Sequence, residues 1–275
     1  KQRPSRRASF LPLPSLAAAA GGLTGMFLEL VGPPGAGKTQ FCMHAAALAA
    51  CNGNEVFWLD TEGSFSPQRV LQMLVQIHAQ DSATTASAAS VLEELAVNAL
   101  DKIRVRACGS LQDVHSVAAE LARRARAGEA LPGLVIVDSI AAVARNEGDA
   151  TEKRSSWVPR RQSALSSLAA AFKTLVGTES DGAAPTVIIA NQVAGDPLSG
   201  RAKASLGHVW HHAVNWRLAL CHCHPHQHRG SGTKELSMGS TRRTLLVEKS
   251  PCAAQLAIDY DITPGGVREV RWNGP

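Results

Sequence analysis

Aromatic side chains are scarce in this chain of 275 residues, which contains one Tyr, six Phe and five Trp. Alanine, valine and leucine must therefore build much of the interior. No apolar run reaches the roughly 18 residues that a membrane-spanning helix needs, and residues 16–25 lack the layout of a secretion signal. Hydrophobic residues make up 45% of the chain and charged residues 19%, as in an ordinary globular protein. We therefore expect one large or two small domains and no membrane partner.

The cysteines show no spacing typical of a disulfide framework. They are Cys42, Cys51, Cys108, Cys221, Cys223 and Cys252. In a chain of this size, scattered cysteines favour reduced thiols, and hence a cytosolic or nuclear compartment. The run from Cys221 to His228 alternates cysteine and histidine, which are ligand types that zinc accepts. Because alternate residues of a strand face opposite sides, metal binding by this run stays an open alternative.

A glycine-rich loop is the most informative segment of the chain. Residues 32–39 read Gly-Pro-Pro-Gly-Ala-Gly-Lys-Thr, which matches the phosphate-loop pattern G-x-x-x-x-G-K-S/T. An apolar run at 27–31 precedes the loop, and an alanine-rich helical stretch at 40–50 follows it. This order directs backbone N–H groups and the positive end of a helix dipole toward one anionic ligand. We therefore predict a nucleoside triphosphate site formed by Gly32, Pro33, Pro34, Gly35, Ala36, Gly37, Lys38, Thr39 and Gln40.

Phosphoryl transfer also requires charge neutralisation, a metal ion and a positioned water molecule. We expect Lys38 to reach the β- and γ-phosphates of ATP and the Thr39 hydroxyl to bind Mg²⁺. The second metal-side group should be an acid at the carboxyl end of an apolar strand, and Asp138 follows the run 134–137. The alternative is that Asp138 is an ordinary helix N-cap after a strand.

Two further polar side chains follow predicted strands. Glu62 lies just after the run 56–59, where a carboxylate can orient and deprotonate an attacking water molecule. Gln192 follows the run 186–190, where a neutral amide can sense a γ-phosphate through hydrogen bonds. Taken alone, each segment is equally consistent with an acidic turn or a polar strand end.

Short apolar runs alternate with helical stretches from about residue 27 onward. The apolar runs are 27–31, 56–59, 134–137, 186–190, 216–220 and 245–248, and helices are predicted at 67–80, 91–99, 112–127 and 162–176. This alternation predicts an α/β fold with a mostly parallel, twisted sheet and helices on both faces. The last two runs should form an antiparallel hairpin at the sheet edge. Residues 1–20 are basic and then Pro- and Ala-rich, so we expect a tail or linker there.

In this order and spacing, the segments resemble the ATPase core of the RecA-type recombinases, specifically the eukaryotic and archaeal recombinases and their paralogues. Besides the phosphate loop, the resemblance rests on Leu-Asp-Thr-Glu-Gly-Ser-Phe at 59–65, Val-Asp-Ser-Ile-Ala at 137–141 and Ala-Asn-Gln-Val at 190–193. Leu-Gly-x-x-Trp at 206–210 and Lys-Ser-Pro at 249–251 are most similar to the B-type recombinase paralogues. The resemblance covers about residues 22–270 and implies a RecA-like P-loop ATPase domain at 21–275.

The resemblance also implies roles for individual residues. Glu62 matches the catalytic glutamate, Gln192 the γ-phosphate sensor, and Arg69 the arginine that packs on the adenine. Two DNA-binding loops fall at about 145–161 and 193–205. Their basic residues are Lys153, Arg154, Arg160, Arg161, Arg201 and Lys203, which we expect to contact phosphates of single-stranded or branched DNA. The alternative for each cluster is a solvated charged loop, and the net charge of +5 does not decide between them.

The resemblance implies a nuclear DNA-repair ATPase that hydrolyses ATP slowly and assists homologous recombination as a subunit of a paralogue complex. The second predicted loop, at 193–205, contains no aromatic residue that could stack between bases, so autonomous strand exchange is not expected. Two alternatives stay open. One is a non-catalytic assembly subunit in which ATP is structural, and the other is a self-sufficient strand-exchange recombinase.

Overall fold

The computed structural model describes residues 10–21, 24–81, 89–145, 154–178, 184–194, 203–204, 206–222 and 243–270. The strands are β1 (Phe27–Gly32), β2 (Val56–Asp60), β3 (Ile103–Ala107), β4 (Leu134–Asp138), β5 (Thr186–Ala194), β6 (Lys203–Ala204), β7 (Trp216–His222), β8 (Arg243–Lys249), β9 (Ala257–Thr263) and β10 (Gly266–Glu269). The helices are α1 (Pro14–Ala20), α2 (Lys38–Cys51), α3 (Pro67–Asp81), α4 (Ala89–Leu100), α5 (Leu111–Arg126), α6 (Ile140–Arg145), α7 (Arg154–Val176) and α8 (Gly207–Ala213). Within these described ranges, no helix is long and apolar enough to cross a membrane.

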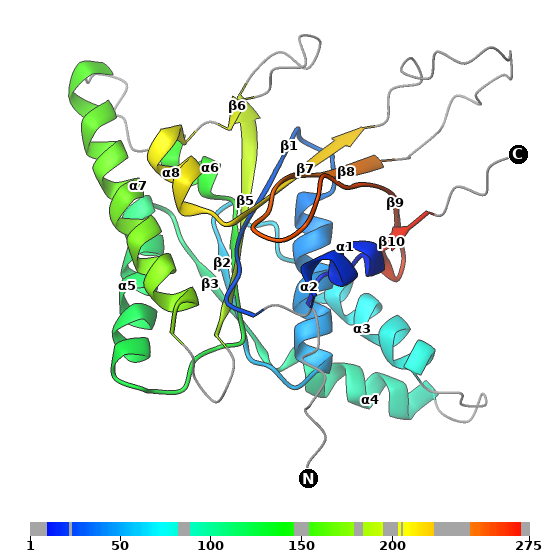
Figure 1. The fold of residues 1–275 in the computed structure, drawn as a ribbon. Helices are drawn as coiled ribbons and strands as arrows, with labels where there is room; N and C mark the ends of the chain where they lie inside the picture. The colour runs from blue at the N-terminus through cyan, green and yellow to red at the C-terminus, as the bar shows by residue number, and fades with distance from the viewer. Residues whose placement is uncertain are drawn as a thin grey trace, which may run out of the picture.

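The strands form one mixed sheet in the order β10-β9-β8-β7-β1-β5-β4-β2-β3, with β6 beside β5. β1 lies near the centre and pairs in parallel with β5 and β7, and β4, β2 and β3 continue the parallel part. β7 to β10 pair antiparallel. Helices α1 to α4 lie on one side of the sheet and α5 and α7 on the other (Figure 1). The predicted α/β fold with a mostly parallel sheet is confirmed.

The edge of the sheet differs from the prediction. β7 and β8 pair antiparallel as expected, but β9 and β10 extend the sheet beyond that hairpin. In β9, Asp259 and Asp261 alternate with apolar residues, and in the opposite edge strand β3 two arginines do the same. Strands of this kind carry a weaker apolar signal than the buried central ones. The four predicted helices are present as α3, α4, α5 and α7, although α7 begins at Arg154 instead of Gln162.

The sheet separates two apolar cores, and its strands supply side chains to both. In β4, Leu134 and Ile136 pack into the core under α2 and α3, whereas Val135 and Val137 pack into the core under α5 and α7. Successive side chains of a strand point to opposite faces, so a strand buried on both faces needs a continuous apolar run. The all-apolar run that suggested a parallel strand is therefore explained by this double burial.

Residues 10–20 differ from the tail that we expected. Residues 14–20 form α1, and Leu13 and Leu16 are fully buried in the core on the α2 side. Ser15 donates hydrogen bonds from its backbone N–H and its hydroxyl to Glu269, which ties α1 to β10. Apolar residues in this stretch thus bury against the domain, and the packed core begins before the predicted boundary at residue 21.

Candidate nucleotide site

The glycine-rich loop joins β1 to α2, as its sequence predicted. Gly37 has φ of 99°, in the left-handed region that L side chains rarely adopt. A Cβ atom at this residue would also lie 2.8 Å from Cδ1 of Ile262. At Gly32, a Cβ atom would lie 2.5 Å from the carbonyl oxygen of Leu220. The left-handed backbone of Gly37 and the close packing at Gly32 and Gly37 therefore both require glycine at these positions.

Lys38 lies at the first position of α2 and folds over the loop. Its Nζ atom donates hydrogen bonds to the carbonyl oxygens of Gly32, at 2.8 Å, and Pro33, at 3.0 Å. Burial lowers the pKa of Lys38, and the charges of Asp138 and Glu62 partly offset this effect. The structure therefore brings the predicted lysine and both predicted acids into one electrostatic environment. Its contact with the phosphates of ATP remains a prediction.

Asp138 ends β4 and is almost fully buried. Its carboxylate accepts a hydrogen bond from the hydroxyl of Ser64, at 2.9 Å, and another from Thr39. Burial raises the pKa of Asp138, Glu62 and Asp60 add to the rise, and the two hydrogen bonds oppose it. A hydroxyl and a carboxylate that face each other form a hard oxygen donor set, which fits Mg²⁺. Thr39 and Asp138 could thus hold the predicted metal ion.

Glu62 and Gln192 come from different strand ends and meet at the loop. In the pairing of β1 with β5, Gln192 lies opposite Gly32. Nε2 of Gln192 donates to Oε1 of Glu62 at 3.2 Å, and the Ser139 hydroxyl donates to the same oxygen at 2.6 Å. Thr61 links the ends of β2 and β4 because its hydroxyl is bonded to the backbone N–H and carbonyl of Ser139. The three predicted strand-end groups therefore share one cluster with Lys38.

Arg69 and Gln40 also come together. Nε of Arg69 donates to Oε1 of Gln40 at 2.8 Å. The same guanidinium group donates to the carbonyl oxygens of Thr263, at 2.6 Å, and Pro264, at 2.7 Å. Burial lowers the pKa of Arg69. Arg69 therefore joins α2 and α3 to the turn between β9 and β10, and its predicted packing on adenine remains a prediction.

Several residues of the site were not predicted. The hydroxyl of Tyr260, in β9, donates to the carbonyl oxygen of Ala36 in the loop at 2.7 Å. Nη1 of Arg145, at the end of α6, donates to Oε1 of Gln192 at 2.7 Å. These bonds join residues 224 and 47 positions apart, and no local motif marks them. Ser139 and Ser64 lie inside the segments 137–141 and 59–65, so the sequence already placed both serines close to Asp138 and Glu62.

A buried ion pair supports the strands below the loop. Glu29 of β1 is fully buried, and its Oε2 accepts a hydrogen bond from Nε of Arg217 at 2.8 Å and lies 2.7 Å from Nη2 of the same guanidinium group in an ion pair. Its Oε1 accepts from Nδ2 of Asn191, at 2.7 Å, and from the Trp210 indole N–H, at 3.1 Å. A buried charge of this kind is tolerated because it is paired and hydrogen-bonded on both oxygens. The network therefore fixes β1, β5, β7 and α8 relative to one another.

The structure describes only some of the residues predicted to contact DNA. Lys153 and Arg201 lie outside the described residues, Arg154 begins α7, and Lys203 begins β6. Arg160 is exposed and Arg161 half-buried in the first turns of α7. The segment expected as one loop up to Arg161 is helical from Arg154, with Pro159 inside the helix. Residues 193–194 and 203–204 pair antiparallel, so the ends of the second predicted loop form a short ladder.

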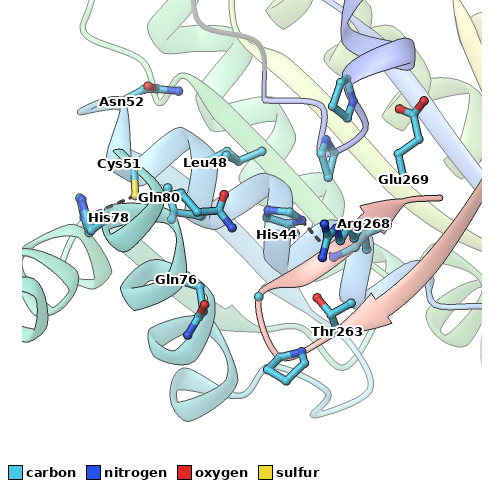
Figure 2. Close-up of a pocket in the computed structure, with 16 residues that line it drawn as sticks. His44, Leu48, Cys51, Asn52, Gln76, His78, Gln80, Thr263, Arg268 and Glu269 are labelled. Carbon is cyan, nitrogen blue, oxygen red and sulfur yellow. Dashed lines mark hydrogen bonds between the residues drawn. The ribbon is translucent and has the colours of Figure 1, made fainter. Parts of the chain in front are cut away.

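A separate hollow of about 1100 Å³ lies between α2, α3, the chain before α1 and the turn after β9 (Figure 2). Its lining includes His44, Cys51, His78 and Arg268, and none of the predicted site residues. Cys51 and His78 lie within hydrogen-bond distance there, with Sγ and Nε2 3.5 Å apart. In the parts of the chain that the structure describes, three or more potential ligands do not gather into a metal site. Most of the alternating cysteine and histidine run at 221–228, from Cys223 onward, lies outside the described residues.

Comparisons with known proteins find a matching family model and related proteins. A family model described as an AAA domain matches residues 7–176. "DNA repair protein RAD51 homolog 2" from Mus musculus is 30% identical over 273 residues, which cover 88% of this chain and 69% of the mouse protein. "DNA repair protein RAD51 homolog 4" from Mus musculus is 31% identical over 233 residues, covering 84% of this chain and 63% of that protein. The chain thus spans about two thirds of the length of these relatives.

A solved structure shows the same fold. The "Crystal structure of the RadB recombinase" aligns with a TM-score of 0.61 at 23% identity, covering 94% of this chain and 98% of that one. Its likeness concerns the fold alone, whereas the family model and the relatives concern the sequence. From the family model and the two relatives, the chain belongs to the RecA-type recombinase paralogue family.

Proposed function

We propose that this chain is a DNA-repair ATPase of the recombinase-paralogue type, which binds ATP and Mg²⁺ and assists homologous recombination. The observation that carries the proposal is the hydrogen bond between Gln192 and Glu62, at 3.2 Å. These residues are 130 positions apart, yet they meet beside the phosphate loop with Asp138 and Lys38 nearby. A site that used nucleotide only as structural support would not require a carboxylate and an amide donor at this place.

Each side chain has a defined role in this proposal. Lys38 and the loop N–H groups bind the phosphates, and Arg69 with Gln40 lies on the side of the base. Thr39 and Asp138 hold Mg²⁺, which neutralises phosphate charge when it is bound. Glu62 orients the attacking water and accepts its proton, and Gln192 senses the γ-phosphate.

The proposal also includes partners. The relatives' names describe DNA repair proteins, which supports this use of the fold over other uses. Single-stranded or branched DNA would be bound through phosphate contacts by Lys153, Arg154, Arg160, Arg161, Arg201 and Lys203. Other recombinase-paralogue subunits would complete the assembly, and the nucleus would be the compartment.

The test is release of phosphate from ATP by the full chain with Mg²⁺, measured with and without single-stranded DNA. Glu62→Gln should bind ATP about as well as the unaltered chain but hydrolyse it at least ~100-fold more slowly, because it lacks the base. Lys38→Ala should lose ATP binding by at least ~10-fold, because it removes charged hydrogen bonds to phosphate. Arg126→Gln, at an exposed position on α5, serves as a matched control and should change neither quantity.

Two results would contradict the proposal. If DNA did not change the rate of phosphate release, ATP hydrolysis would not be coupled to DNA binding. If Glu62→Gln hydrolysed ATP at the unaltered rate, Glu62 would not be the catalytic base. If, in addition, Lys38→Ala prevented assembly with partner subunits, ATP would be a structural ligand of a non-catalytic subunit.

A further inference from the structure

The side chain of Gln192 is held at both ends. Its Oε1 accepts from Nη1 of Arg145 at 2.7 Å, and its Nε2 donates to Oε1 of Glu62 at 3.2 Å. A guanidinium group has only donors, and an ionised carboxylate has only acceptors. Only one orientation of the amide satisfies both neighbours. The amide thus bridges a cation and the carboxylate that we assign as the base.

This bridge restricts what Gln192 can reach. Nε2 of Gln192 carries two N–H donors, but moving the amide as a group toward the γ-phosphate of a bound nucleotide breaks its bond to Arg145, its bond to Glu62, or both. Glu62 is held a second time by the hydroxyl of Ser139, at 2.6 Å. The arrangement therefore describes a resting state, in which the sensing amide is fixed to the base by an arginine outside the phosphate loop.

The position of Arg145 allows its guanidinium group to exchange Gln192 for another acceptor. It is the last residue of α6 and is exposed. Among the described residues, no carboxylate forms an ion pair with it, and its recorded partner is the neutral amide of Gln192. A phosphate group offers a guanidinium two charged oxygens for a bidentate ion pair, whereas the amide of Gln192 offers one neutral oxygen. A phosphate near α6 would therefore compete with Gln192 for Arg145.

We propose that Arg145 is a positioning residue that holds Gln192 in the resting orientation, and that a phosphate of bound DNA releases Gln192 by taking over the guanidinium group. The inference rests on the proposed function, because it uses the roles of Gln192 and Glu62 assigned there. It adds the step by which DNA binding controls hydrolysis: the contact is made at α6, and the effect is carried to Glu62 through one side chain.

The test compares the full chain with Arg145→Gln, Arg145→Lys and the matched variant Arg126→Gln, which removes the same charge from the end of α5. Without DNA, Arg145→Gln should raise kcat by about 3- to 10-fold, which corresponds to the net strength of one hydrogen bond. The factor by which saturating single-stranded DNA raises the kcat of Arg145→Gln should fall toward one. The amide nitrogen of Arg145→Gln lies two bonds nearer the backbone than Nη1, so it falls short of Gln192, whereas Arg145→Lys keeps a longer, charged donor and should restore the low DNA-free rate. Arg126→Gln should behave like the unaltered chain.

A second measurement does not depend on hydrolysis or on DNA. Affinities for ATPγS and for ADP are obtained by competition with a fluorescent nucleotide. A released Gln192 can reach the γ-phosphate, so Arg145→Gln should raise the ratio of ATPγS to ADP affinity by about 3-fold or more. A fall in this ratio would mean that Arg145 itself binds the γ-phosphate, which would overturn the proposal.

Other outcomes are equally decisive. A DNA-free rate that is unchanged or lower in Arg145→Gln would overturn the proposal, and a loss of DNA affinity alone would reduce Arg145 to a simple DNA contact. If the unaltered chain hydrolysed no ATP or ignored DNA, the proposed function would fail on that result. The affinity ratio would still decide the role of Arg145, because an unchanged ratio contradicts it and a raised ratio supports it.

Discussion

The hydroxyl group of Tyr260 donates a hydrogen bond to the carbonyl oxygen of Ala36 over 2.7 Å, and both residues are fully buried. Tyr260 is the single tyrosine of the chain, and it lies in the antiparallel part of the sheet. Ala36 lies in the phosphate loop. The loop is therefore supported from a strand that comes more than two hundred residues later in the chain.

Tyr260→Phe should lower the free energy of unfolding by about 1–2 kcal/mol, because the carbonyl of Ala36 then loses its partner inside the protein. The affinity for ATP should also fall, since the loop loses one support. Urea denaturation and nucleotide titration measure the two effects. Ser116→Ala removes a hydroxyl bonded to a backbone carbonyl at an exposed helical position, so it is the control and should cost less than about 0.5 kcal/mol.

Arg217→Met should lower the free energy of unfolding by about 3–5 kcal/mol, because it leaves the carboxylate of Glu29 buried without its cation. Adding Glu29→Gln removes that charge and keeps an oxygen that can accept from Asn191 and Trp210. The double variant should therefore regain more than half of the loss in urea denaturation. A double variant as unstable as the single one would show that the ion pair itself is not the cause.

His44 should make stability depend on pH. Burial lowers its pKa from 6.5 to about 4, with a further contribution from the charge of Arg69. Its Nδ1 accepts from the Val267 N–H at 3.1 Å and must be unprotonated to do so. Between these pKa values the unfolded chain binds more protons than the folded one, so stability is full above the unfolded pKa and is lost as pH falls.

Between about pH 7 and pH 5, this effect should lower the free energy of unfolding by about 2 kcal/mol. His44→Gln does not titrate in this range and can still accept from Val267, so its loss over the same interval should be smaller by that amount. His212→Gln, at an exposed residue, is the control and should keep the full dependence. Equal slopes for His44→Gln and the unaltered chain would refute the assignment.

The nucleotide site was predictable because its signals are local. A glycine-rich loop between a strand and a helix needs only neighbouring residues, and Asp138, Glu62 and Gln192 each follow an apolar run directly. Parallel strands bring their carboxyl ends to one edge, so the meeting of these groups followed from the fold class. The structure brings these groups together, and their chemical roles stay predictions.

The remaining contacts depend on residues far apart in the chain. Arg145 reaches Gln192 because α6 follows β4, which pairs with β5, and Tyr260 reaches Ala36 from β9, which is three strands away from β1 in the sheet order. Neither pair has a spacing that a motif could encode. The helix α1 was missed for a related reason, since a short Pro- and Ala-rich stretch reads as a linker until its partner Glu269, more than 250 residues later, is in place.

Two adjacent amides of β5 serve opposite sides of the sheet. Asn191 donates to Glu29 in the buried ion-pair network, and Gln192 donates to Glu62 at the nucleotide site. Successive side chains of a strand point to opposite faces, so the face that each amide occupies depends on its position in the strand and not on its chemistry alone. β5 should therefore reject any change of length before Asn191. One inserted residue would reverse the faces of the two amides, so Glu29 would lose the bond from Asn191 and Gln192 would point away from Glu62; related sequences should therefore show no gaps here.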